Sequence, residues 1–277
     1  MSEPLGLIAG NGRFPFLVAA AARRRGRRVV VVAIREEAAP ELEREVDELH
    51  WVGLGQLGKA IAVLRGAGAR EAVMAGQVKH RQIFADIVPD LKLMAVLARL
   101  AFKNTDSLIG GVADALESEG IRLISSVALL EDQLATPAAM TRRKPDRAAR
   151  ADVAYGVRIA RALGALDLGQ TVVVKDRAAV ALEAMEGTDE VIRRAGRIAG
   201  PGTTVVKLAK PRQDLRFDVP VVGPGTLAAM AEAGAATLAV EARRTLLLER
   251  EEFLAQAERQ GLAVWGCQPE DAGESGS

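Results

Sequence analysis

The chain of 277 residues is long enough for two compact domains, and its formal net charge of +1 excludes the strong basic excess typical of nucleic-acid-binding proteins. One cysteine and two histidines exclude a disulfide framework and a zinc site built from the usual ligands. We find neither a signal-peptide pattern nor an apolar stretch that approaches the length of a membrane span, so we expect a cytoplasmic protein.

The first 134 residues alternate short apolar runs with amphipathic patterns, which is typical of an α/β domain with a parallel sheet. The pattern at 91–102 is apolar around most of a helix, and both core packing and a lining for acyl chains would explain it. Strands are predicted at 5–9, 29–34, 49–52, 72–75 and 122–125, and helices at 14–25, 56–67, 91–102 and 107–119.

Residues 135–146 combine prolines, small residues and charges, which indicates an interdomain linker. A distinct second α/β domain is predicted over 147–267, and a polar tail at 268–277 is expected to be disordered. In the second domain, helices are predicted at 147–163, 189–197, 226–233 and 249–260, and strands at 171–175, 179–182, 204–208, 215–221, 237–240 and 262–265.

A glycine-containing turn, Gly10-Asn11-Gly12, follows the first predicted strand, and Gln77 follows the fourth. In parallel α/β sheets this edge binds ligands, and the helix that begins after the turn offers free N–H groups to an anion. Pro15 replaces the third glycine of the dinucleotide-binding fingerprint, which disfavours a nicotinamide site. A phosphate-binding loop and a purely structural turn both remain open.

The stretch from Glu183 to Asp189 precedes a predicted helix of the second domain. Thr188 as the N-cap, with Asp189 in the first turn, would explain these residues by capping alone. Glu183 and Glu186 lie close by in the sequence, so the combination could also supply oxygen ligands for Mg²⁺.

An alternating segment follows Lys207 and Lys210. Read as a strand, it projects Asp214, Arg216 and Asp218 to one side and apolar residues to the other. Carboxylates that can hold a divalent cation, near bases that can hold phosphates, suit phosphoryl chemistry. A solvated, salt-bridged edge strand is the alternative explanation.

Three phrases of the second domain resemble a known family: Leu168-Gly-Gln170-Thr-Val-Val-Val-Lys175, Glu183-Ala-Met-Glu186-Gly-Thr-Asp189 and Gln213-Asp-Leu-Arg-Phe-Asp218-Val-Pro-Val-Val-Gly223-Pro-Gly-Thr226. They are similar to the metal-dependent UDP-2,3-diacylglucosamine pyrophosphatases of lipid A biosynthesis, the type unrelated to calcineurin-like enzymes. The Ala-Gly-Asn-Gly-Arg-Phe-Pro turn and the Ala-Gly-Gln-Val loop match as well, so the resemblance reaches to Cys267. One departure is Ala149-Arg-Ala-Asp152, where the family has a more Gly/Asp-rich phrase.

The resemblance implies a Rossmann-like N-terminal domain, a distinct C-terminal α/β domain, and hydrolysis of UDP-2,3-diacylglucosamine to UMP and 2,3-diacylglucosamine 1-phosphate (lipid X) with Mg²⁺ or Mn²⁺. It implies that the binding partner is a lipid-linked sugar nucleotide and not a nucleic acid. It also implies at most peripheral contact with the inner membrane, and it leaves room for a homo-oligomer. A non-catalytic nucleotide-sugar or lipid-binding module is the alternative. The resemblance places the family's essential aspartate on Asp218. Together with the patterns above, it gives a candidate site with Asp218 as catalytic residue, with Asp218, Asp214 and Asp189 as metal ligands, and with Gly10, Asn11, Gly12, Gln77, Gln170, Thr188, Lys210, Gln213 and Arg216 as substrate-binding residues.

Overall fold

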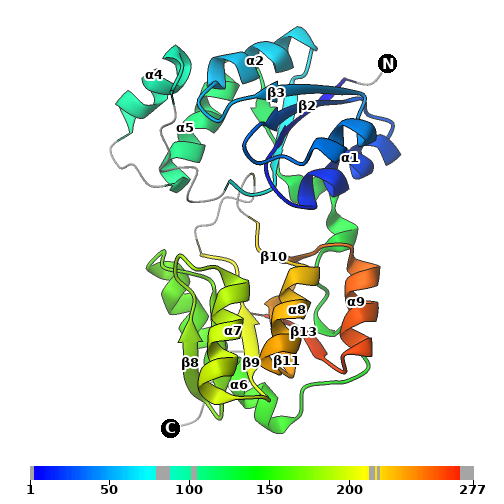
Figure 1. Ribbon diagram of the computed structural model, residues 1–277, viewed down its shortest axis with the longest axis vertical. Helices are drawn as coiled ribbons and strands as arrows, with labels where there is room; N and C mark the ends of the chain where they lie inside the picture. Colours follow the sequence, from blue (N-terminus) through cyan, green and yellow to red (C-terminus); the bar gives the residue numbers. More distant parts are fainter. Residues whose placement is uncertain (1–2, 79–87, 101–104, 212–215, 217–218, 269–277) are drawn as a thin grey trace. The chain divides into compact units, whose positions relative to one another are not determined.

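The computed structural model describes residues 3–78, 88–100, 105–211, 216 and 219–268. These residues form two compact units (Figure 1). One unit runs from the N-terminus to Glu131 and includes Arg216, and the other comprises the remaining described residues from Asp132 onwards. Among the described helices, none combines the length and the apolar character needed to cross a bilayer.

The first unit is built on a five-stranded parallel sheet with the order β3-β2-β1-β4-β5. The strands are β1 (Leu5–Ala9), β2 (Val29–Ile34), β3 (Glu48–Val52), β4 (Glu71–Ala75) and β5 (Arg122–Leu123). The helices are α1 (Phe14–Arg24), α2 (Leu57–Gly66), α4 (Leu91–Arg99) and α5 (Thr105–Ser118). The 3-10 turns are η1 (Pro40–Glu45), η2 (Ser126–Leu129) and η3 (Glu131–Gln133). The turn η3 contains the last residue of the first unit and the first residues of the second.

Strand β2 shows why this sheet is covered on both faces. All six of its residues are buried, as expected for an apolar strand inside a parallel sheet. Val30 and Val32 belong to one core with residues of α2, α4 and α5. Helix α1 and the turn η1 pack together, and α1 also contacts β1, β2 and β4. Helices on both faces leave the strand ends as the place where loops can bind a ligand.

The second unit contains a six-stranded mixed sheet with the order β6-β13-β11-β9-β7-β8. Strands β9, β11 and β13 are parallel, whereas β7, β8 and β6 run antiparallel to their neighbours. The strands are β6 (Ala138–Ala139), β7 (Thr171–Lys175), β8 (Ala178–Leu182), β9 (Thr204–Lys207), β11 (Thr237–Glu241) and β13 (Ala263–Cys267), and a separate pair is formed by β10 (Val221–Val222) and β12 (Leu246–Leu247).

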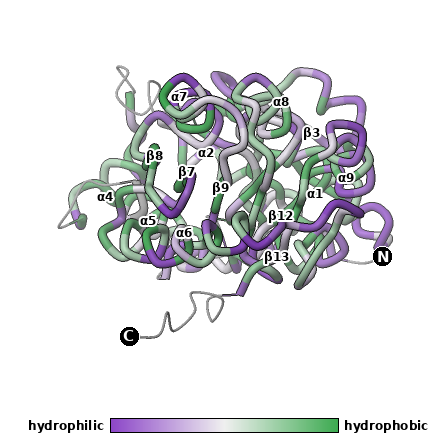
Figure 2. Tube along the Cα trace, turned by 90° about the horizontal axis from the view of Figure 1, so that it is seen from below, coloured by the Kyte–Doolittle hydropathy of each residue, from purple (hydrophilic) through white to green (hydrophobic). Residues whose placement is uncertain are grey.

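Helices cover both faces of this sheet too. Helix α6 (Arg147–Ala165) packs Val153 and Val157 with Val172 and Val206, which lie on one face of the sheet. Helices α7 (Thr188–Ala199), α8 (Pro224–Ala233) and α9 (Arg250–Arg259) share the core on the other face. Figure 2 shows hydrophilic and hydrophobic residues alternating along α7, as expected of a helix with one buried face.

The linker predicted at 135–146 is wrong. Ala138 and Ala139 form the edge strand β6 against β13, the Ala135 N–H donates to the Thr245 carbonyl (2.9 Å), and Thr141 is buried. Edge strands need few side chains because backbone hydrogen bonds hold them. The small residues and prolines that indicate a linker therefore suit an edge strand as well.

The strand predicted at 215–221 is also wrong where the structure describes it. Arg216 lies in a turn, Val219 and Pro220 lie outside any strand, and only Val221–Val222 pair as β10. Alternation predicts which side chains share a face, but a strand needs a partner for its ladder of hydrogen bonds. Pro220 also lacks an N–H to donate. Asp214 and Asp218 lie outside the described residues.

The other predicted strands and helices are confirmed in type, with ends that differ by a few residues. Residues 101–102 of the helix predicted at 91–102, and residues 269–277 of the predicted tail, lie outside the described residues. The short strands β6 and β12 and the 3-10 turns are absent from the sequence prediction, because elements of two to six residues carry too little periodicity to be recognised.

Gly156 allows α6 to approach the sheet closely. A methyl group at this position would lie 2.6 Å from Val206 Cγ2 and 3.1 Å from Val174 Cγ2. For Gly156→Ala we expect an overpacking penalty of about 1–3 kcal/mol, which outweighs the gain of about 1 kcal/mol in helix propensity. Urea unfolding followed by Trp265 fluorescence, in a variant without Trp51, measures the stability of the second unit.

The matched control is Gly110→Ala in α5, where a methyl group would meet nothing within 4 Å. This change should stabilise the first unit by about 0.5–1 kcal/mol, measured through Trp51 without Trp265. If Gly156→Ala were as stable as the parent protein, the close approach of α6 would not constrain the fold.

Candidate functional site

In the first unit, the sequence-predicted loops meet at the point where the strand order reverses. The chain passes from β1 to β2 and β3 on one side and then to β4 and β5 on the other. The carboxyl ends of β1 and β4 therefore flank a topological switch point, which is where parallel α/β sheets bind ligands. Gly10, Asn11 and Gly12 follow β1, and Gln77 follows β4.

The two loops are joined through their backbones. The Asn11 N–H donates to the Gln77 carbonyl (2.8 Å), and the Gln77 N–H donates to the Asn11 carbonyl (3.1 Å). A methyl group on Gly10 would lie 2.7 Å from the Gln77 carbonyl oxygen, and one on Gly76 would lie 2.6 Å from that of Asn11. Loop closure thus explains the glycine at position 10, whereas Gly12, with φ +94° and open space around it, needs glycine for its backbone alone.

Polar groups gather around this closed pair of loops. Asn11 Nδ2 donates to Glu37 Oε2 at 3.4 Å, and Glu37 is buried. No side chain caps the N-terminus of α1, and Pro15 lies in its first turn. A helix N-terminus with no capping side chain attracts anions. The sequence signal for Glu37 is an acid shortly after the second predicted strand.

In the second unit, two parallel strands end in buried charges. Lys207 ends β9 with 5% of its surface exposed, and Glu241 ends β11 with 4% exposed. Lys207 is one of the bases that the sequence places near the predicted carboxylates, whereas Glu241 belongs to no predicted site. The signal that would have found Glu241 is a charged residue at the carboxyl end of a predicted parallel strand, since ligands bind at this edge.

Thr188 connects Lys207 to a buried carboxylate. Lys207 Nζ donates to Thr188 Oγ1 (2.8 Å), which donates in turn to Glu183 Oε1 (3.0 Å). The Thr171 hydroxyl lies 3.2 Å from that of Thr188. The capping prediction for Thr188 is wrong: the N-cap of α7 is Gly187, and the Thr188 hydroxyl turns to the two charged groups instead. The result is a cation held in place next to a carboxylate.

Gln170 adds a buried acceptor to this cluster. Its N–H donates to Glu183 Oε2 (3.3 Å), and its carbonyl accepts from the Leu208 N–H (3.0 Å). Its side-chain oxygen Oε1 is buried and meets no hydrogen-bond donor among the described residues. Such an atom is costly unless a donor reaches it, and a substrate hydroxyl or amide is a donor of the right kind.

Glu241 holds the start of the segment that leads to Asp218. Its Oε2 accepts from the Ala209 N–H (2.8 Å), and its Oε1 accepts from Arg244 (3.1 Å). Because both oxygens are engaged and the residue is buried, the backbone at Ala209 is fixed relative to β11.

The remaining predicted site residues are dispersed. Lys210 Nζ pairs with Asp167 Oδ1 at 2.5 Å, whereas Arg216 belongs to the first unit and pairs with Glu117 at 3.3 Å. Gln213, like Asp214 and Asp218, lies outside the described residues. The structure thus groups Gln170 with Thr188, and Gly10, Asn11 and Gly12 with Gln77.

The described carboxylates near Thr188 have structural partners. Asp189 Oδ2 lies 2.9 Å from the position of a methyl group on Gly225, so its charge faces the first turn of α8, a favourable place for an anion. The carboxylate of Glu186 accepts hydrogen bonds from its own N–H, from the Ala184 N–H and from Arg194, and these hold its pKa below the usual value although burial opposes them. Within the described residues, no group of three or more His, Cys, Asp or Glu side chains is placed to hold a metal.

The link through Thr188 makes a testable prediction about stability. Thr188→Val removes the hydroxyl shared by Lys207 and Glu183, and hydrogen bonds to charged groups contribute about 1.5–3 kcal/mol each. We expect a loss of about this size in the unfolding free energy of the second unit, measured by urea unfolding with Trp265 as the probe. Thr188→Ser retains the hydroxyl and should keep most of the stability. A loss in Thr188→Ser with none in Thr188→Val would mean that the methyl group, not the hydroxyl, matters.

Comparisons with known proteins identify the family over nearly the whole length of the chain. The family model described as the LpxI N-terminal domain matches residues 4–133, and the one described as the LpxI C-terminal domain matches residues 136–265. The UDP-2,3-diacylglucosamine pyrophosphatase LpxI of Caulobacter vibrioides is 34% identical over 278 residues, which cover 96% of this chain and 98% of that protein.

A crystal structure of the biotin carboxylase subunit of pyruvate carboxylase also matches, with a TM-score of 0.28 and 14% identity. The match covers 72% of this chain and 42% of that one, and carries no argument at this score. The two family models and the relative agree over nearly the full length, and the chain belongs to the LpxI family.

Proposed function

We propose that this protein hydrolyses the diphosphate of UDP-2,3-diacylglucosamine to UMP and 2,3-diacylglucosamine 1-phosphate, a step of lipid A biosynthesis. The observation that carries the proposal is the 34% identity, over nearly the whole length of both chains, to a protein that bears this activity in its name. Both units have the polar groups at the carboxyl ends of parallel strands that a nucleotide-sugar hydrolase needs.

Cleavage of a diphosphate builds up negative charge on the phosphoryl oxygens, and preorganised cations stabilise it. Lys207 suits this role because Thr188 holds its ammonium group in a buried position next to the N-terminus of α7. Lys210, Gln213 and Arg216 would supply further contacts to the substrate. The buried Gln170 Oε1 would accept a hydrogen bond from a hydroxyl or amide of the sugar.

Asp218 is the residue that we propose to orient the attacking water or a bound cation. With Asp214 and Asp189 it offers carboxylate oxygens, the ligands that Mg²⁺ and Mn²⁺ prefer. Such a cation would polarise a phosphoryl oxygen and offset its charge. In the first unit, Gly10, Asn11, Gly12 and Gln77 would contact the substrate through backbone and amide groups.

The substrate carries two acyl chains, so it resides in a bilayer, and we propose a cytoplasmic protein that contacts the inner membrane peripherally. A membrane surface would concentrate bound copies of the protein, and the proposal therefore leaves room for a homo-oligomer.

The first test is the reaction itself. Purified protein incubated with UDP-2,3-diacylglucosamine in detergent micelles should release UMP when Mg²⁺ or Mn²⁺ is present, and a chelator should stop the release. Chromatography of the uridine products measures it. No release with either cation would contradict the proposal, and tight substrate binding without product would favour a non-catalytic binding module.

The second test concerns Asp218. Asp218→Ala should lower kcat at least about a hundredfold while substrate still binds, because loss of one group that orients water or a cation costs several kcal/mol of transition-state stabilisation. The control is Asp132→Ala, which removes an exposed carboxylate whose partner is the adjacent Gln133. A variant at position 218 with near-parental turnover would show that the carboxylate is not part of the catalytic machinery.

A further inference from the structure

Helix α4 and the residue that shortly precedes it expose three large apolar side chains. Val88 is 85% exposed, Leu91 84% and Met94 53%, all within seven residues. The opposite side of α4 contributes the buried Leu93 and Val96 to the core formed with α2 and α5. Core packing thus explains the inner face of the helix and leaves the outer face unexplained.

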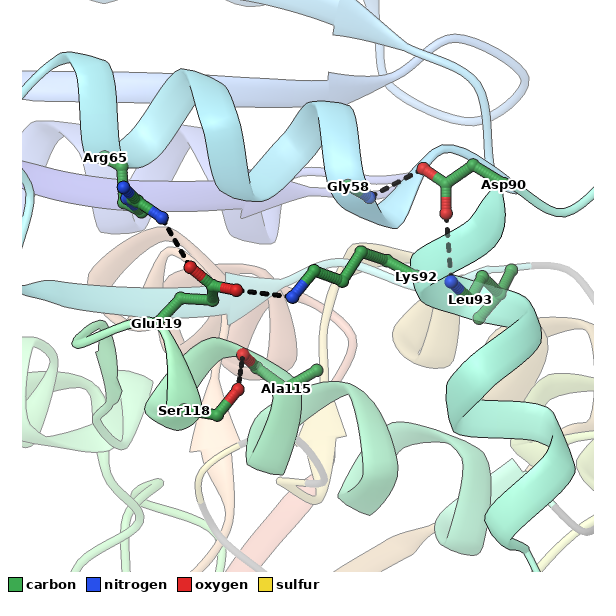
Figure 3. A network of polar contacts seen from close by, with 8 residues as sticks. All are labelled: Gly58, Arg65, Asp90, Lys92, Leu93, Ala115, Ser118 and Glu119. Carbon is green, nitrogen blue, oxygen red and sulfur yellow. Dashed lines mark hydrogen bonds and ion pairs between the residues drawn. The ribbon is translucent and has the colours of Figure 1, made fainter.

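The charges on α4 have one sign. Between Leu91 and Arg99 the helix carries Lys92 and Arg99, both exposed, and no acidic residue. Asp90 precedes the helix, but its carboxylate caps the end by accepting from the Leu93 N–H (2.9 Å) and from the Gly58 N–H (2.6 Å), as Figure 3 shows. The outer face is therefore apolar with cations along its edge.

Among the described side chains, the Glu119 carboxylate lies at this edge, and two cations share it. Glu119 pairs with Lys92 and with Arg65, which approach it from α4 and α2 (Figure 3). Hydrogen bonds from Lys92 first and Arg65 second hold the pKa of Glu119 below its usual value, so it stays ionised. These three side chains together carry one net positive charge; Arg99 adds a second, and the capping Asp90 offsets one of the two.

The other basic stretch of this unit, the arginines between 23 and 28, is different. Arg23 donates to the Glu45 carbonyl and Arg25 to the Ala128 carbonyl, while Arg27 pairs with Glu71. These arginines hold the fold together, and none of the large exposed apolar side chains lies between 23 and 28.

We propose that the outer face of α4, defined as Val88, Leu91 and Met94 with Lys92 and Arg99, docks on a bilayer that contains anionic phospholipid. A helix of this kind lies in the plane of the interface, with its apolar residues among the acyl chains and its cations at the headgroups. The inference rests on the proposed function, because it supplies a way for a protein without a described membrane-spanning helix to reach a lipid substrate.

A second copy of the chain fits this face less well. Three exposed side chains, two on a short helix and one just before it, provide far less than the roughly 800 Å² per partner of a stable interface. Pairing the face with itself would also bring Lys92 and Arg99 of two copies together, and like charges repel.

Vesicle sedimentation tests the proposal with the full chain. The protein should bind phosphatidylcholine vesicles that contain phosphatidylglycerol more tightly than pure phosphatidylcholine vesicles, and added salt should weaken the binding. The double change Leu91→Ser and Met94→Ser should lower the affinity about tenfold or more. Arg99→Gln should lower it about fivefold on the anionic vesicles alone.

The matched control is Ile198→Ser, which removes an apolar side chain of α7 that is 63% exposed; it should bind vesicles like the parent protein. Circular dichroism melting checks that each variant folds, which we expect because the altered side chains are exposed. Unchanged vesicle affinity in the double variant, or equal affinity for both kinds of vesicle, would overturn the proposal. A dimer in light scattering that the double variant dissociates would overturn it in favour of self-association.

Turnover on substrate in detergent micelles separates this inference from the proposed function. The double variant should release UMP from micelles at the parental rate while its vesicle binding falls. If the parent protein binds anionic vesicles but releases no UMP, docking stands and the proposed function fails.

Discussion

A buried lysine and a buried glutamate, joined through one threonine hydroxyl, are the constraint on which the second unit depends. Burying an unpaired charge costs several kcal/mol, and the Thr188 hydroxyl gives both Lys207 and Glu183 a polar partner. The link also ties the ends of β8 and β9 to the first turn of α7. The hydrogen bonds that position these strands and this helix therefore also hold the Lys207 ammonium group at the edge of the sheet.

Both units place their polar groups by the same rule but with different chemistry. Parallel strands bring their carboxyl ends to one edge, and the loops that follow them converge there. In the first unit the loops close through backbone hydrogen bonds between Asn11 and Gln77, made possible by Gly10. In the second unit the edge carries the buried side chains of Lys207 and Glu241. One edge thus offers backbone and amide groups, and the other offers charge.

Helix α4 serves the core and the surface at once. Leu93 and Val96 stabilise the first unit from inside, while Leu91 and Met94 face solvent. A helix that needed only to cover the sheet would gain solubility from polar residues on its outer face. The apolar outer face is therefore a feature that folding alone does not require, and the cations Lys92 and Arg99 give it a chemical preference.

The sequence by itself determined the alternation of strands and helices in both units, because hydrophobic periodicity is a local property that can be read along the chain. It also identified the turn at Gly10–Gly12, since glycine spacing after a strand is local too. Only the tertiary structure decided that residues 138–139 form an edge strand rather than a linker, and that Arg216 lies in a turn. It alone joined Thr188 to Lys207 and Glu183 and made Glu241 the anchor of Ala209. The physical reason is that hydrogen bonds and burial depend on which distant segments meet, and neither periodicity nor spacing within one segment contains that information.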